Sequence, residues 1–251
     1  MTDNSLTARD YLEHHAAPEP GAEVTVTGYS LGGALSPSYA LYLYDTQGDR
    51  GKHGRGWDAR CNVTLNCLPV AGATPGDKVF SDYYYERLGG RTNRYWNKKD
   101  VVPHAWEIDM LYQIPTLYAP TIKFDFSDDA LLYSLLTLLW ALTSGKHYTQ
   151  LRADRSFAED STVIPVSGDD TFHRFLSELG YQHIDRYGQI FQISQFQDAV
   201  TRIVPLPQKF FTSLVTKEQS DQLRAQISAL VAKHQVSPEM IQTFAAKSAA
   251  Q

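Results

Sequence analysis

The spacing of apolar and polar residues predicts an alternation of strands and helices along the chain. Residues 23–27 read Glu-Val-Thr-Val-Thr, and an apolar side chain at every second position is typical of a β-strand. Further strands are expected over residues 61–70 and 91–97. Helices are expected after residue 30, where Pro37 would kink the helix, and over residues 8–16, 77–88, 128–146, 170–179, 217–233 and 238–250.

Strands that alternate with helices favour a largely parallel sheet. We therefore expect an α/β fold in which helices flank one mostly parallel sheet. With 251 residues, 43% of them hydrophobic, the chain is long enough for one domain with a sizeable core. The prediction is a single domain over residues 1–251, with a helical C-terminal extension over residues 210–251.

The most apolar stretch of the chain, residues 131–142, has two interpretations. It is shorter than the roughly 20 residues that a helix needs to cross a bilayer. A buried helix is expected, and a helix that faces lipid is the alternative.

A sharp turn with a serine at its apex follows the first predicted strand. The residues Gly28-Tyr29-Ser30-Leu31-Gly32 fit the pattern Gly-x-Ser-x-Gly. Glycine on both sides lets a strand and a helix cross closely, so that Ser30 can hold an unfavourable backbone conformation. This arrangement is the nucleophile elbow of α/β-hydrolases, and the region is predicted to be part of such a fold. The alternative is a glycine-rich loop whose serine only caps a helix.

A serine nucleophile needs an imidazole to take its proton and a carboxylate to orient that imidazole. In α/β-hydrolases the order along the chain is serine, acid, histidine. Asp100 follows the strand predicted over residues 91–97, in a loop stiffened by Pro103, where α/β folds carry functional groups. The alternative is that Asp100 is a turn residue beside two lysines.

Among the histidines that follow Asp100, His183 fits the third role best. It comes just after Gly180, where we expect the helix over residues 170–179 to end, so a loop can carry it over the sheet edge. A purely structural role is the alternative. The remaining histidines lie too close to Asp100, beside an apolar stripe or at polar helix ends: His104, His173, His147 and His234.

Four motifs in a fixed order carry a resemblance to a known family. They are the elbow over residues 24–35, the segment Ala71-Gly72-Ala73-Thr74-Pro75-Gly76, the loop Asp100-Val101-Val102-Pro103 and the segment Tyr181-Gln182-His183. Together they resemble the class 3 lipase family, which includes the fungal triacylglycerol lipases. The resemblance covers residues 20–190.

The resemblance implies Ser30 as the nucleophile, Asp100 as the orienting acid and His183 as the general base. It also implies ester hydrolysis through an acyl-enzyme without a cofactor. The backbone N–H of Leu31 is implied as one oxyanion donor.

The chain departs from the family pattern at two places. Tyr29 stands where the family usually has histidine, a position that varies. In the family several strands, a second oxyanion donor and a lid precede the elbow, whereas 22 residues precede Glu23 here. We expect a fragment of a longer gene product or an N-terminally truncated relative. The lack of a second donor would lower turnover of the chain alone by about 10²–10³-fold.

Truncation has a structural consequence for the strand over residues 23–27. That strand should lie at or near a sheet edge, where unpaired backbone groups favour pairing with another chain. We expect self-association, or pairing with a missing N-terminal half.

Charge and composition narrow the remaining classes. A net charge of −5 argues against nucleic acid as a partner. Cys61 and Cys67 are expected to be buried thiols rather than a disulfide, and no metal-ligand spacing occurs. The polar residues 1–10 carry no signal-peptide core, which favours a cytoplasmic location, although the true start of the protein is open.

The sequence therefore predicts a serine hydrolase that cleaves carboxylic esters, acylglycerols or other lipid esters above all. A phospholipase or a small-ester esterase is an alternative, because the lid and cleft walls that select the substrate are missing here. The alternative from another class is a catalytically impaired remnant that acts as a binding or assembly subunit. The presence of a second oxyanion donor would distinguish these two classes.

Overall fold

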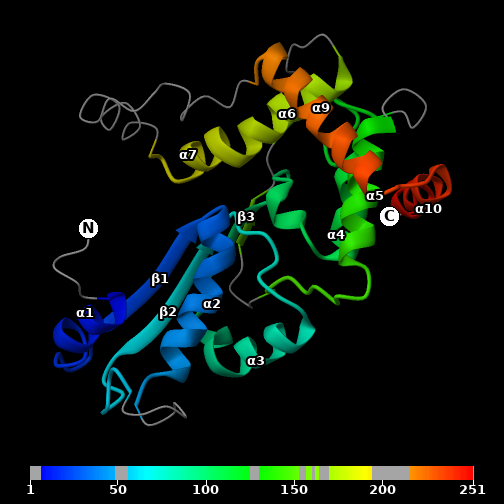
Figure 1. The fold of residues 1–251 in the computed structure, drawn as a ribbon. Helices are drawn as coiled ribbons and strands as arrows, with labels where there is room; N and C mark the ends of the chain where they lie inside the picture. Colours follow the sequence, from blue (N-terminus) through cyan, green and yellow to red (C-terminus); the bar gives the residue numbers. More distant parts are fainter. Residues whose placement is uncertain are drawn as a thin grey trace. The chain divides into compact units, whose positions relative to one another are not determined.

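A computed structural model describes residues 7–48, 56–124, 130–152, 157–159, 162–163, 170–193 and 215–250. The chain divides into two compact units, which are described one at a time (Figure 1). Unit 1 comprises Met1–Trp96 with Thr149–Phe157, and unit 2 comprises Asn97–Tyr148 with Ala158–Gln251. The single domain expected over residues 1–251 stays a prediction.

Unit 1 is built on a parallel sheet, as the alternation of strands and helices predicts. Strand β1 (Glu23–Tyr29) pairs in parallel with β2 (Thr64–Val70), and β2 pairs in parallel with β3 (Tyr95–Asn97). The order in the sheet is β1-β2-β3-β4, where β4 is Phe157–Glu159. Within the described residues, β1 therefore lies at one end of the sheet, as expected from the sequence.

Helix α2 (Leu31–Asp45) packs along β1 and β2 and covers one face of these strands (Figure 1). Every second side chain of β2 is buried, and Leu65 and Cys67 are among them. Thr25 of β1, by contrast, is exposed. Helix α3 (Lys78–Leu88) packs on α2, and α1 (Ala8–His15) precedes the sheet. Their core consists of Ala40, Leu41, Leu43, Trp57, Val63, Leu65, Cys67, Tyr84, Leu88 and Leu151.

The third strand is shorter than predicted. Arg91, where the sequence predicts the start of the strand, belongs instead to the 3₁₀ turn η1 (Gly89–Arg91). The Thr92 hydroxyl donates to the Leu88 carbonyl at 2.8 Å and is 2.7 Å from the Tyr84 hydroxyl. Thr92 already has extended backbone geometry and forms an isolated parallel bridge with Cys67, but the continuous strand begins at Tyr95.

The two cysteines are free thiols, and the prediction of burial is right for one of them. Cys67 is buried in β2, whereas Cys61 is exposed. Cys61 lies in the turn before β2 and has φ of 52°, so it does not belong to the strand that the sequence predicts over residues 61–70.

The close approach of α2 to the sheet requires glycine at position 33 but not at position 32. A Cβ added to Gly33 would overlap the backbone carbonyl oxygen of Val70, whereas one added to Gly32 meets nothing within 4 Å. The contact of α2 with the end of β2 therefore uses the glycine after the Gly-x-Ser-x-Gly motif, and Gly28 within the motif lets β1 approach the backbone of Gly32 as closely.

We expect Gly33→Ala to lower the free energy of unfolding by about 1–3 kcal/mol or more, because the strand end must shift. Gly32→Ala is the matched control, and it should be neutral or stabilising by up to about 1 kcal/mol, since alanine is the better helix former. Urea unfolding of both variants measures the difference. Equal midpoints would contradict the close approach at Gly33.

Unit 2 is helical. It contains α4 (Ile108–Gln113), α5 (Ala130–Thr143), α6 (Thr171–Gly180), α7 (Arg186–Ile190), α9 (Lys217–Lys233) and α10 (Pro238–Ser248). Short turns η2 (Val102–His104) and η3 (Ile114–Thr116) lie near α4. The predicted C-terminal helices α9 and α10 have Thr216 and Ser237 as their N-cap residues, whose side chains accept capping hydrogen bonds from backbone N–H groups of the first turn.

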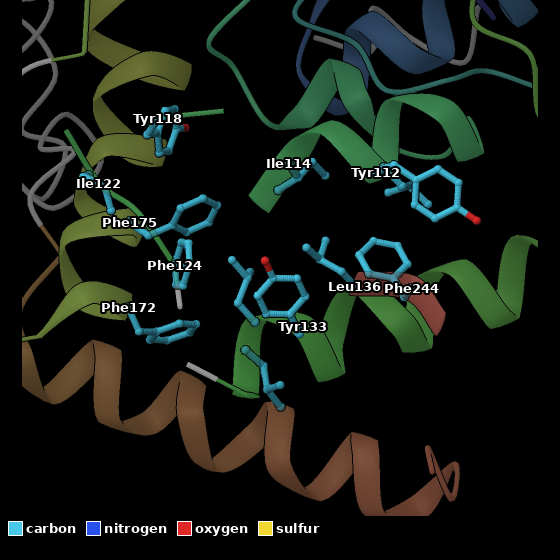
Figure 2. Close-up of a cluster of buried hydrophobic side chains, with 13 residues drawn as sticks. Tyr112, Ile114, Tyr118, Ile122, Phe124, Tyr133, Leu136, Phe172, Phe175 and Phe244 are labelled. Atoms are coloured by element: carbon cyan, nitrogen blue, oxygen red, sulfur yellow. The ribbon is translucent and has the colours of Figure 1, made fainter. Parts of the chain in front are cut away.

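Aromatic side chains fill the core of unit 2 (Figure 2). Phe175 of α6 lies between Tyr118 and Phe124, with ring centroids 5.1 and 5.0 Å away. Helix α5, the most apolar stretch of the sequence, packs against α4, α9 and α10 and buries Leu132, Leu136 and Leu138. The expectation of a buried helix is confirmed. None of the described helices has the length and apolar character that a membrane span requires.

Candidate active site

Ser30 lies at the sharp turn between β1 and α2. Its backbone has φ of 57° and ψ of −115°, a conformation that costs a residue other than glycine of order 1–3 kcal/mol. Its N–H donates to the Val70 carbonyl at 3.0 Å, which fixes the turn against the end of β2. Ser30 occupies the N-cap position of α2, but its side chain makes no capping hydrogen bond to the helix.

Leu31 is the first residue of α2 and is 71% exposed. An α-helix leaves the N–H groups of its first turn without intrahelical partners. The Leu31 N–H therefore has the helix position that an oxyanion donor needs, next to Ser30.

Asp100 lies in the loop after β3 and is completely buried. Its Oδ1 accepts a hydrogen bond from the Val102 N–H at 3.0 Å. Its Oδ2 accepts one from Nδ1 of His183 at 2.8 Å and another from the Tyr187 hydroxyl at 3.0 Å. Burial raises the pKa of the Asp100 carboxyl, and the bonds from His183, Val102 and Tyr187 work against that increase.

His183 does not lie in a loop, so this part of the sequence prediction is wrong. Gly180 does not end the helix, because its φ of −59° and ψ of −46° are ordinary helical values. The chain continues through η4 (Tyr181–Asp185), a π-helical turn closed by the Arg186 N–H on the Tyr181 carbonyl, and then into α7. π turns occur often at functional sites.

The contact of His183 with Asp100 fixes the chemistry of the imidazole. With Nδ1 donating to the carboxylate, Nε2 is the ring nitrogen that can accept a proton. The His183 side chain is 12% exposed, so the ring is largely removed from water.

A buried polar network holds this pair, and sequence reasoning missed it. The Asn97 side chain donates to the carbonyl and side-chain oxygens of Gln182 at 3.2 and 2.7 Å. Gln182 donates to Glu178 at 2.7 Å, and the Asn97 N–H donates to the Tyr187 hydroxyl at 2.8 Å. Asn97, Glu178 and Gln182 are fully buried. The only signal in the sequence is the four-residue spacing of Glu178 and Gln182 and of His183 and Tyr187, which places each pair on one helix face.

The other candidate histidines make different contacts. His104 approaches the backbone carbonyl of Asp100 through Nδ1 at 2.7 Å, and His173 approaches the carbonyl of Val215 through Nε2 at 2.8 Å. His147 and His234 are exposed. The described residues contain no group of three or more His, Cys, Asp or Glu side chains that could hold a metal ion.

The predicted site residues fall into two pairs. Asp100 and His183 meet within unit 2, whereas Ser30 and Leu31 adjoin each other in unit 1. The assembly of one triad from these two pairs stays a prediction.

Comparison with known proteins finds a family match for part of the chain. Residues 7–110 match the family described as Lipase (class 3), and the chain therefore contains a class 3 lipase family domain. The structure is similar to the crystal structure of M37 lipase, with 30% sequence identity and a TM-score of 0.60. That match covers 74% of this chain and 49% of the M37 lipase chain, so this chain spans about half of that protein. A comparison with curated proteins gives no match.

Proposed function

We propose that this protein is a serine hydrolase that cleaves carboxylic esters of lipids through a Ser30–His183–Asp100 triad. The observation that carries the proposal is the 2.8 Å contact between the buried Asp100 carboxylate and Nδ1 of His183. The strained turn at Ser30 and the class 3 lipase domain support it.

In the proposed reaction the Ser30 hydroxyl attacks the ester carbonyl while Nε2 of His183 takes its proton. Asp100 holds the imidazole in the tautomer with hydrogen on Nδ1 and stabilises the imidazolium that forms. The Leu31 N–H donates to the oxyanion of the tetrahedral intermediate. His183 then returns the proton to the leaving alcohol, and water releases the acyl group from Ser30 by the same steps.

An acyl chain is the substrate group that the surface next to Ser30 favours. Leu31 and Leu35 lie one turn apart on α2 and are 71% and 57% exposed. Apolar side chains at the start of the nucleophile helix suit an apolar acyl group. Family membership also implies a lipid substrate, so we favour acylglycerols over small water-soluble esters.

A second candidate is a weakly catalytic subunit that binds or assembles with another chain. Two observations favour it: the match spans 49% of M37 lipase, and β1 lies at one end of the sheet among the described residues. In this case self-association through β1, or pairing with a further half, would complete the fold.

A fluorophosphonate probe tests the proposed function on the full chain. The probe should modify the peptide that contains Ser30, and mass spectrometry identifies that peptide. Ser38→Ala, at an exposed serine on the same helix, is the matched control and should be modified equally. No modification of the wild-type chain would favour the second candidate, and modification at another serine would remove Ser30 from the mechanism.

A further inference from the structure

Tyr187 and His183 hydrogen-bond to the same oxygen of Asp100. The Tyr187 hydroxyl lies 3.0 Å and the His183 Nδ1 lies 2.8 Å from Oδ2. The tyrosine is 3% exposed and the aspartate is completely buried, so water does not compete for these bonds. Two donors on one carboxylate oxygen therefore fix its position from two directions.

The direction of the Tyr187 bond follows from its second partner. The backbone N–H of Asn97 donates to the Tyr187 oxygen at 2.8 Å. A phenol has one hydrogen to give. Because Asp100 is ionised in its orienting role, that hydrogen is donated to the carboxylate.

The π turn brings the required side chains to one side of the helix. Gln182 and Tyr187 both bond to Asn97, although they are five positions apart in the sequence. In a regular α-helix of 3.6 residues per turn, side chains five apart point about 140° away from each other. The π turn η4 contains Gln182 and ends two residues before Tyr187, and it accommodates an additional residue in one turn, which narrows that angle.

His183 and Tyr187 are four residues apart in the sequence, a spacing that puts both on one helix face, and both bond to Asp100. The base, its acid and the buried network are therefore aligned by a single local irregularity.

We infer that Tyr187 is a positioning residue, which holds the Asp100 carboxylate in place for His183 through its hydroxyl. The inference rests on the proposed function, in which His183 is the general base. The hydroxyl also takes up part of the negative charge on Oδ2. Without it, more of that charge acts on His183 and the Asp100–His183 pair retains a proton to higher pH.

A purely structural tyrosine would act through its ring. The Tyr187 ring stacks on Phe191, with centroids 6.3 Å apart, and meets the His183 ring edge-on at 6.4 Å. Tyr187→Phe keeps these ring contacts and removes only the hydroxyl, so the substitution separates the two roles.

The test is an NMR titration of the His183 ring protons in the full chain, combined with hydrolysis of a p-nitrophenyl ester. In Tyr187→Phe the titration midpoint of the Asp100–His183 pair should rise by about one pH unit. The free energy of a hydrogen bond to a charged group corresponds to a shift of about that size. The acid limb of the pH–rate profile should move by the same amount. We expect kcat to fall about tenfold, with KM within about twofold.

Tyr181→Phe is the matched control, because the Tyr181 hydroxyl lies in the same π turn but donates to Gln189 at 3.2 Å. It should leave both the midpoint and kcat unchanged. If Tyr187→Phe does not fold, a fluorotyrosine placed at position 187 supplies a stronger donor of nearly the same shape and should lower the midpoint.

An unchanged midpoint in a folded Tyr187→Phe, or a shift of the same size in Tyr181→Phe, would overturn the inference. A midpoint that does not fall with fluorotyrosine would also overturn it. The NMR readout needs no turnover, so a chain that shifts as expected but is neither active nor modified by the fluorophosphonate probe would refute only the proposed function.

Discussion

Replacing Ser30 by alanine should lower the turnover of a p-nitrophenyl ester by about 10⁶-fold, the loss expected when a serine nucleophile is removed from a working triad. Stability should change by less than about 0.5 kcal/mol. The Ser30 side chain makes no capping bond to α2, and alanine meets the same backbone strain at φ of 57° as serine does.

Ser30→Gly separates the chemical role of this position from its structural cost. It should be as inactive as Ser30→Ala, yet more stable by about 1 kcal/mol or more, because glycine adopts positive φ without strain. Thermal unfolding beside the ester assay measures both effects. Activity in Ser30→Ala above a few per cent of wild type would place the nucleophile elsewhere, and a glycine variant less stable than the alanine variant would contradict the strain.

The elbow could be predicted because it is local. The alternation over residues 23–27, the glycines and the apolar helix that follows are all contained in one short stretch, and each favours the same strand–turn–helix unit. The parallel sheet follows from the alternation of strands and helices for the same reason. Asp100 was predictable from its place after a strand, although the strand itself is shorter than its sequence suggests.

The setting of His183 could not be predicted from local signals. Glycine after a helical stretch usually marks its end, yet Gly180 stays helical and the helix widens into a π turn. The bonds that accompany this turn come from Asn97 and Asp100, which are 80 or more residues away along the chain. Tertiary contacts of this kind override local propensity. Their only signal in the sequence is the four-residue spacing of Glu178 and Gln182 and of His183 and Tyr187.

Asp100→Asn should lower turnover by about 10⁴-fold, the effect of placing an imidazole in the wrong tautomer. With its oxygen accepting from the Val102 N–H, the asparagine would direct its NH₂ group at Nδ1 of His183. Nδ1 must then accept, so the ring hydrogen moves to Nε2, and this nitrogen can no longer take a proton in the proposed reaction.

The same substitution should stabilise the fold at neutral pH. Burial raises the pKa of Asp100 in the folded state above its unfolded value of about 3.9. A group with a raised folded pKa contributes stability that is fully present below the unfolded pKa and is lost as pH rises through the folded pKa. At neutral pH the wild-type chain has lost that contribution, because the buried Asp100 carboxyl is charged. The asparagine of Asp100→Asn carries no charge at any pH, so the variant avoids this loss.

The melting temperature of Asp100→Asn should therefore exceed that of wild type at pH 7–8. The difference should shrink as pH falls through the folded pKa of Asp100 toward about 3.9. Asp109→Asn, at an exposed carboxylate in the first turn of α4, is the control and should follow wild type closely at every pH. Thermal unfolding across this pH range measures both. A variant that is less stable than wild type at every pH would show that the bonds from His183 and Tyr187 outweigh the burial of the charge, and full activity would show that another group orients His183.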